Sequence, residues 1–164
     1  METETRDITI TDIRKLLDEV TDPEIPVISI HDLGVLRDVR KEGDTFVITI
    51  TPTYSGCPAM DMITLNIHGK LRAHHIPHFK VETQLAPAWT TDWMTDEGKR
   101  KLKEFGITPP MGSKGSEDLI NRHPPCPFCN SENTELVSAF GSTACKALFR
   151  CRDCSEPFDY FKCH

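Results

Sequence analysis

The chain has 164 residues, of which 38% are hydrophobic and 27% charged, and its formal net charge at pH 7 is −6. This composition is typical of a soluble globular protein with one ordinary core and a small second module. The negative charge argues against a general affinity for nucleic acids. The acidic first residues contain no apolar leader, and no stretch approaches the roughly 18 consecutive apolar residues of a membrane span. We therefore expect a cytoplasmic protein without a membrane partner.

The first two thirds of the sequence predict helices and strands in the order α-β-β-α-β-α. Apolar residues at helical spacing indicate the helices, and alternating apolar residues around Lys41-Glu42-Gly43-Asp44 indicate a β-hairpin. The predicted elements are a helix at 10–20, strands at 35–40 and 45–53, a helix that begins at Pro58 and ends before Pro77, a strand at 78–85 and a helix at 96–105.

Residues 107–124 are rich in proline, glycine and serine and lack periodicity, which is typical of a linker. This linker would divide the chain into an α/β domain at 1–106 and a C-terminal module at 125–164. Alternating residues in the module predict a small three-stranded ribbon, with strands at 135–140, 143–150 and 158–163.

Four cysteines of the module form two Cys-x-x-Cys pairs, Cys126 with Cys129 and Cys151 with Cys154, separated by 21 residues. Each pair can hold one side of a tetrahedral ion, so the spacing predicts a structural site of four thiolates. Zn²⁺ is the expected ion because it favours this geometry, although the same thiolates could hold iron or an iron–sulfur cluster. Two disulfides are the alternative, but nothing in the sequence indicates an oxidising compartment.

A separate cysteine, Cys57, is expected at the N-terminal cap of the helix that Pro58 opens. Free backbone N–H groups and the helix dipole favour a thiolate at such a position, so Cys57 is a candidate nucleophile or transient metal ligand. The alternative is a buried structural cysteine. A nucleophile needs a base, and no histidine is tied to Cys57 by its spacing, which weakens a hydrolase interpretation.

Three further groups of residues allow two interpretations each. Asp22 and Glu24 could hold iron beside Cys57 or guide a partner, or they only shape the turn between the first helix and the first strand. Cys145 and Cys163 exceed the needs of a four-ligand site, so they are either buried or form additional thiolates that relay iron or a cluster. The two tryptophans of the segment Pro87-Ala-Trp-Thr-Thr-Asp-Trp93 form a satellite core or a protein-binding surface.

Several long segments resemble known families. DPEIPVISIHDLGVLRDV at 22–39 and TPTYSGCPAM at 51–60 resemble the MIP18 family, whose members serve iron–sulfur protein assembly. LAPAWTTDWM at 85–94 and FGSTACKALFRCRDCSEPFDYFKC at 140–163 resemble the PaaD family, which is encoded in phenylacetate degradation clusters together with phenylacetyl-CoA 1,2-epoxidase. The resemblance implies an α+β fold, in which a MIP18-type α-β-β-α-β-α domain precedes a small zinc ribbon.

The resemblance also implies roles for individual residues. Asp22, Glu24 and Cys57 match the acidic loop and reactive cysteine of the family, and the four paired cysteines match its metal-binding tail. We expect an accessory factor, not an enzyme, that inserts iron or an iron–sulfur cluster into the oxygenase or reductase component, with iron–sulfur assembly proteins as further partners. The alternative is a stable structural or electron-transfer subunit of the oxygenase complex. The identity of the client, the metal bound in the cell and the oligomeric state, with a dimer among the options, stay open.

Overall fold

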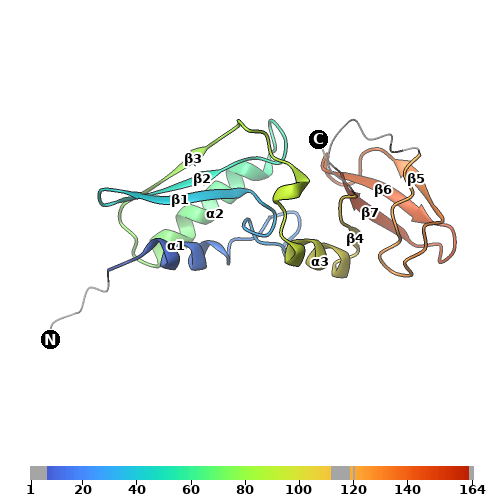
Figure 1. Ribbon diagram of the computed structural model, residues 1–164, viewed down its shortest axis with the longest axis horizontal. Coiled ribbons are helices and arrows are strands. Elements are labelled where there is room, and N and C mark those ends of the chain that lie inside the picture. The colour runs from blue at the N-terminus through green and yellow to red at the C-terminus, as the bar shows by residue number, and fades with distance from the viewer. Residues whose placement is uncertain (1–6, 112–118, 120, 163–164) are drawn as a thin grey trace.

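The computed structural model describes residues 7–111, 119 and 121–162, and this part of the chain has an α+β fold with two small sheets (Figure 1). The first sheet contains β1 (Leu36–Glu42), β2 (Thr45–Ile50) and β3 (Phe79–Thr83), in that order. β1 and β2 pair antiparallel as the predicted hairpin. β3 pairs parallel to β2 because α2 (Ala59–Ala73) returns the chain between them. The predicted α+β class is confirmed.

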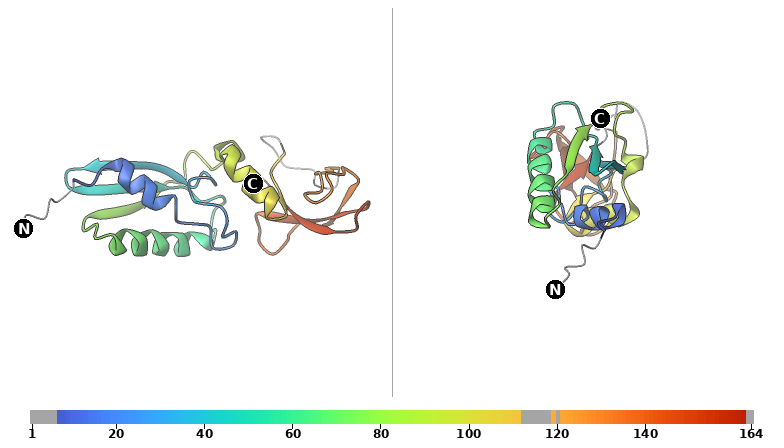
Figure 2. Two further views of the ribbon diagram at one scale, coloured as in Figure 1. Left: turned by 90° about the horizontal axis from the view of Figure 1, so that it is seen from below. Right: turned by 90° about the vertical axis from the view of Figure 1, so that its left-hand side faces the viewer.

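The core of the first domain lies between the first sheet and two helices, α1 (Ile10–Leu17) and α2, which contact each other (Figure 2). Alternation along β2 sends Phe46, Ile48 and Ile50 into this core, whereas Val47 and Thr49 face the opposite side of the sheet. Ion pairs cover that opposite side and are formed by the charged residues Arg40, Glu42, Lys80 and Glu82. The sheet therefore has one apolar and one charged face.

Trp89 belongs to the hydrophobic core and is therefore not part of a protein-binding surface. Its side chain is 5% exposed, and its Nε1 donates a hydrogen bond to the carbonyl oxygen of Leu33 at 3.0 Å. Trp93 ends the short 3-10 helix η1 (Thr91–Trp93) and stacks under the Arg37 guanidinium, 3.5 Å from the ring centroid. The tryptophan segment is thus packed against the connection between α1 and β1.

Two further contacts hold this segment in place. Gly34 has a φ of 79°, and a Cβ atom there would lie 2.6 Å from the carbonyl oxygen of Trp93, so glycine is required at this position. Asp32 accepts hydrogen bonds from Thr95 Oγ1 at 2.9 Å and from Lys101 Nζ at 2.6 Å. Lys101 belongs to α3 (Asp96–Glu104), which is thereby fastened to the same connection.

The second sheet has the order β4 (Ile107–Thr108), β7 (Pro157–Phe161), β6 (Lys146–Cys151) and β5 (Thr134–Ser138). The last three strands pair antiparallel and form the predicted ribbon. β4 is an addition: it pairs parallel to β7, and both of its residues are buried. The linker predicted at 107–124 therefore does not begin at residue 107, because the apolar Ile107 packs into the core. Among its described residues, 109–111, 119 and 121–124 form neither helix nor strand.

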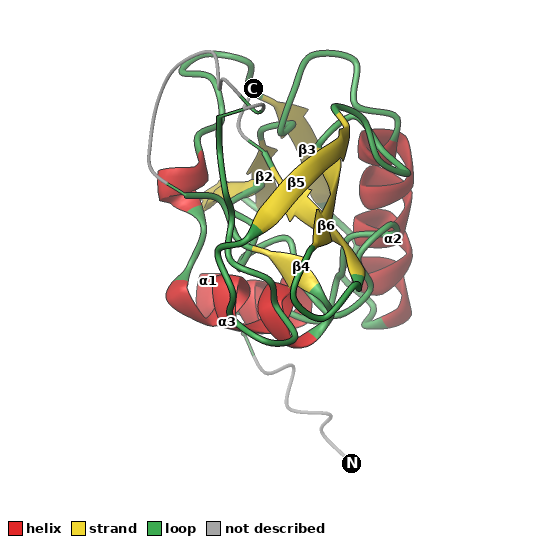
Figure 3. Cartoon of the chain, turned by 90° about the vertical axis from the view of Figure 1, so that its right-hand side faces the viewer, coloured by secondary structure: helices red, strands yellow, loops and turns green. Residues whose placement is uncertain are grey.

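The ribbon lies at one end of the first domain (Figure 1), and seen from that end its strands lie in front of the first domain (Figure 3). Ile107, Cys145 and Phe161 belong to the same continuous hydrophobic cluster as the core of the first domain. The Phe161 and Trp89 rings meet edge to face with their centroids 6.0 Å apart. The ribbon also has a core of its own, formed by Cys126, Ala147, Phe149, Cys151, Phe158 and Tyr160. No helix among the described residues is long and apolar enough to cross a membrane.

Candidate functional site

The two Cys-x-x-Cys pairs form turns of the same shape. The backbone N–H groups of Cys126 and Cys151 each donate to the carbonyl oxygen five residues later, at 2.9 Å in both turns. The residue directly after the second cysteine has a positive φ in each case, 61° at Asn130 and 66° at Ser155. Such backbone conformations turn the chain sharply, so both sulfur atoms of each pair point to the same side.

The four sulfur atoms of these pairs lie within 4.8 Å of one another. The Sγ atoms of Cys126 and Cys154 are 3.7 Å apart, and those of Cys129 and Cys151 are 3.6 Å apart. A tetrahedral zinc ion with Zn–S bonds of about 2.3 Å requires sulfur separations of about 3.8 Å. The sulfur atoms therefore fit a four-thiolate zinc site, and no disulfide joins the described cysteines.

Backbone N–H groups are directed at these sulfur atoms. Hydrogen bonds from the N–H groups of Cys154 and Asp153 lower the pKa of the Cys151 thiol to about 7. The N–H of Glu156 favours a Cys154 thiolate in the same way, but burial and the neighbouring thiols raise the pKa of Cys154 to about 12. Thiols must lose their protons to bind a metal, so a bound cation would take the place of these protons.

Asp153 ties the two turns together. Its carboxylate accepts hydrogen bonds from Asn133 Nδ2 at 2.8 Å and from the Ser131 hydroxyl. The N–H of Arg152 also donates to the carbonyl oxygen of Asn133 at 2.8 Å. These contacts fix the second pair of cysteines opposite the first.

Cys57 lies apart from this group, in the loop between β2 and α2, and is half-buried. The helix begins at Ala59 with Pro58 as its cap, and no side chain makes a capping hydrogen bond. The sequence predicts Cys57 as the N-terminal cap, but the cap is Pro58, so Cys57 lies one residue before it. The reason is a separate turn, in which the Cys57 N–H donates to the carbonyl oxygen of Tyr54 at 3.2 Å.

Tyr54 is a site residue that sequence reasoning missed. Its hydroxyl lies close enough to the Cys57 thiol for the two groups to interact. Burial, followed by the charge of Cys57, raises the pKa of Tyr54 to about 12, so the phenol remains protonated and can donate to the sulfur. The only signal in the sequence was its position three residues before Cys57, between the strand predicted at 45–53 and the helix predicted from Pro58.

Asp22 and Glu24 take different positions beside this loop. Asp22 is 8% exposed, and its Oδ1 accepts hydrogen bonds from the N–H groups of Glu24 at 2.8 Å and Ile25 at 2.9 Å. Asp22 therefore does shape the turn. Glu24 is exposed, and partial desolvation, followed by the charge of Asp22, raises the pKa of its carboxyl. The Tyr54 hydroxyl lies within electrostatic reach of both Glu24 and Cys57.

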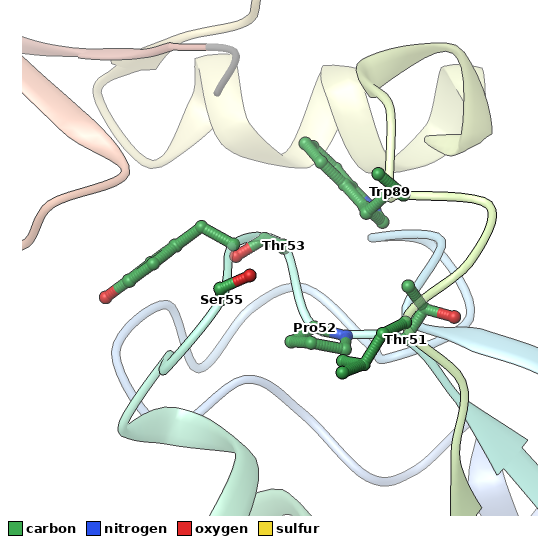
Figure 4. Close-up of a pocket in the computed structure, with 8 residues that line it drawn as sticks. Thr51, Pro52, Thr53, Ser55 and Trp89 are labelled. Carbon is green, nitrogen blue, oxygen red and sulfur yellow. The ribbon is translucent and has the colours of Figure 1, made fainter.

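A pocket of about 240 Å³ adjoins the Cys57 loop (Figure 4). Thr53 and Ser55 of the loop face Trp89 across it. Thr51 lines the same pocket, and its buried hydroxyl has no hydrogen-bond partner among the described residues. The loop is therefore accessible on the side that faces the tryptophan segment, where both polar and apolar side chains line the pocket.

Cys145 is 7% exposed and lies where the ribbon meets the first domain. The Thr143 hydroxyl is 3.0 Å from its sulfur, and burial raises the pKa of the Cys145 thiol. Cys145 is not part of the four-sulfur group. Cys163, the other candidate additional thiolate, lies outside the described residues.

Two family models match different parts of the chain. Residues 10–83 match the family described as iron-sulfur cluster assembly protein. Residues 111–162 match the PaaD zinc beta ribbon domain. The crystal structure of DUF59, a domain of unknown function from Bacillus anthracis, is similar to the first domain, with a TM-score of 0.51 and 28% identity over 56% of this chain and 89% of that chain.

Two named relatives are similar to this chain, one over about half of its length and one over almost all of it. An Fe-S protein maturation auxiliary factor of Porphyromonas gingivalis is 36% identical over 56% of this chain and 88% of its own length. An Escherichia coli K12 protein, provisionally named as a subunit of 1,2-phenylacetyl-CoA epoxidase, is 49% identical over 157 residues, which cover 94% of this chain and 93% of that protein. The four-cysteine ribbon, the preceding iron–sulfur assembly domain and this similarity along almost the whole chain place the protein in the PaaD family.

Proposed function

We propose that this protein is an accessory maturation factor that inserts iron or an iron–sulfur cluster into a component of phenylacetyl-CoA epoxidase, in aerobic phenylacetate catabolism. The observation that carries the proposal is the accessible Cys57 loop, in which the Tyr54 hydroxyl lies close to the thiol and Glu24 lies nearby. This loop belongs to a domain that matches iron–sulfur cluster assembly proteins. In this role the protein assists an oxygenase system and catalyses no reaction of its own.

Cys57 would be the transient ligand of the transferred iron or cluster, assisted by Asp22 and Glu24. A single half-buried thiol occupies one coordination position of a bound metal ion and leaves the others open. A metal ion that is to be transferred needs open positions, because the ligands of the client must bind there. The Oδ1 atom of Asp22 is engaged in the turn, so Asp22 would act mainly by orienting Glu24. Tyr54 would donate a hydrogen bond to the ligating sulfur, which stabilises its negative charge.

The ribbon would hold a permanent Zn²⁺ through Cys126, Cys129, Cys151 and Cys154. Four thiolates fill a tetrahedral shell, so this site suits stability better than transfer. The ribbon would also dock a client component or an iron–sulfur assembly protein. Its exposed apolar side chains favour this docking role: Phe128 is 57% exposed, Val137 56% and Phe140 64%.

A complementation experiment tests the proposal. A strain without this protein is supplied with the wild-type chain, with Cys57→Ser or with the loop control Ser55→Ala, and the reductase and oxygenase components are purified without oxygen. We expect Cys57→Ser to lower iron and acid-labile sulfide in the client to the level of the deletion strain, while Ser55→Ala restores both. Full metal content of both components in the deletion strain would refute the proposal.

The alternative function is a stable structural or electron-transfer subunit of the epoxidase complex, with redox-active iron in the ribbon. The four sulfur atoms are spaced for either ion, so the metal itself must be identified. Protein purified without oxygen should contain zinc and be colourless if the maturation proposal is correct. A visible iron–thiolate spectrum from the ribbon would favour the alternative.

A further inference from the structure

A second pocket, of about 420 Å³, lies where α2 ends and the chain turns into β3. Its lining combines three basic side chains, from the end of the helix and the turn after it, with three apolar residues that lead into β3: His68, Arg72, His75, Ile76, Pro77 and Phe79. α2 runs from the Cys57 loop to the end of the first domain that is remote from the ribbon (Figure 1, Figure 2). The pocket is therefore separate from both the Cys57 loop and the four-sulfur group.

Two of the basic side chains in this pocket are available to a ligand. The Arg72 guanidinium and the His75 imidazole make no hydrogen bond or ion pair with the described part of the chain. By contrast, Lys70 in the same last turn of α2 pairs with Glu19. None of the described residues that line the pocket is acidic. A cation at a helix C-terminus interacts favourably with the helix dipole, but the N–H donors of the Arg72 guanidinium remain unused. The pocket therefore offers these donors to an anion.

The end of α2 has a histidine at a position where glycine is usual. The helix ends in a Schellman motif, in which the Ile76 N–H donates to the Leu71 carbonyl oxygen at 3.0 Å. The His75 N–H donates to the Arg72 carbonyl oxygen, also at 3.0 Å, and completes the motif. This motif needs one residue in the left-handed region, and His75 takes that place with a φ of 59°. Strained residues of this kind are concentrated at binding sites, and the exposed His75 side chain lines the pocket.

The surroundings of the pocket indicate which anion it binds. The last carbonyl groups of a helix carry a partial negative charge, which repels a phosphate dianion more strongly than a carboxylate. Arginine binds a carboxylate through two parallel hydrogen bonds. A metal ion is not the expected ligand, because the four ribbon cysteines are the one set of converging metal ligands in the described part of the chain. Arg72, His75 and Pro77 are all exposed, so a side chain on the surface of another protein can reach the pocket.

We propose that this pocket binds a carboxylate from an acidic surface segment of a partner protein. Arg72 would make the principal contact, and the imidazoles of His68 and His75 would donate further hydrogen bonds. An apolar residue beside the acidic one would pack on Pro77 and Phe79, whose ring is held by an edge-to-face contact with His68 at 5.0 Å between centroids. The inference goes beyond the proposed function, because this surface would hold a partner at the end of the first domain that is remote from the ribbon.

A hexaglutamate peptide with blocked ends serves as the probe for this pocket. It is titrated at low salt into the full chain with zinc in the ribbon, and binding is followed by NMR. The imidazole signals of His68 and His75 and the guanidinium signal of Arg72 should shift together and saturate. Inorganic phosphate is titrated in parallel and should bind more weakly than the peptide. Absence of saturable shifts in these signals, or tighter binding of phosphate than of the peptide, would overturn the inference.

Variants separate a specific pocket from general attraction between charges. Arg72→Gln should weaken peptide binding about fivefold, whereas Lys103→Gln, which removes a charge from the last turn of α3, should leave it unchanged. Equal weakening by both variants would overturn the inference. His75→Gly should weaken binding about twofold and raise the midpoint of urea denaturation, because glycine relieves the backbone strain. A lower midpoint or unchanged binding in His75→Gly contradicts the role of this residue. Dimerisation that depends on protein concentration and is abolished by Arg72→Gln would assign the pocket to a second copy of this chain and would also overturn the inference.

Discussion

Replacing Cys126 by serine should weaken zinc binding and destabilise the ribbon while the first domain stays folded. Its sulfur is fully buried and lies 3.7 Å from that of Cys154, so it is an integral vertex of the four-sulfur group. Structural zinc sites contribute on the order of 10–16 kcal/mol, so one of four thiolates accounts for about 3 kcal/mol, or roughly a hundredfold in zinc affinity. A buried serine hydroxyl without its metal adds a further cost of about 1–3 kcal/mol.

The assay combines zinc stoichiometry, measured after competition with a chromogenic chelator, with amide hydrogen exchange. Exchange in β5, β6 and β7 should become fast in Cys126→Ser, whereas the protection of β2 and α2 should remain. Cys57→Ser is the matched control, since it makes the same chemical change outside the four-sulfur group and should keep zinc. Stoichiometric zinc and a protected ribbon in Cys126→Ser would refute the reasoning. Equal loss of soluble protein from both variants would instead show that Cys57 is structural.

Two further changes test how the first domain is held together. Gly34→Ala should lower the free energy of unfolding by about 3 kcal/mol, because alanine would be strained in the left-handed backbone conformation and its Cβ would clash with the Trp93 carbonyl. A loss below about 1 kcal/mol, measured by urea denaturation, would contradict this expectation. Burial opposes ionisation of Asp32, but hydrogen bonds from Lys101 and Thr95 outweigh it and lower the pKa of this carboxyl. Asp32→Asn should therefore cost about 2 kcal/mol at pH 7, and the difference from wild type should be complete above about pH 5 and shrink as the pH falls below about 4. A difference that grows in acid would give the opposite sign and refute this assignment.

Periodicity in the sequence predicted most elements of the fold, because helix and strand patterns are local. The apolar spacing of Ile63, Ile67 and Leu71 indicated α2, and Gly106 marked the end of α3. Boundaries were less accurate where a turn competed with a helix, as at Cys57, where the hydrogen bond to Tyr54 delays the helix by one residue. The strand β4 was missed because two residues carry no periodic pattern.

The sequence by itself indicated the four-thiolate group, since the spacing within each Cys-x-x-Cys pair is a local property, whereas contacts between the two turns bring the pairs together. Only the tertiary structure decided the surroundings of Cys57 and Cys145. These two residues are 88 positions apart in the sequence, and no local pattern relates them. They share one hydrophobic cluster because Phe161 packs on Trp89 and β4 pairs with β7, which press the ribbon against the first domain. Long-range packing of this kind depends on the whole folded chain.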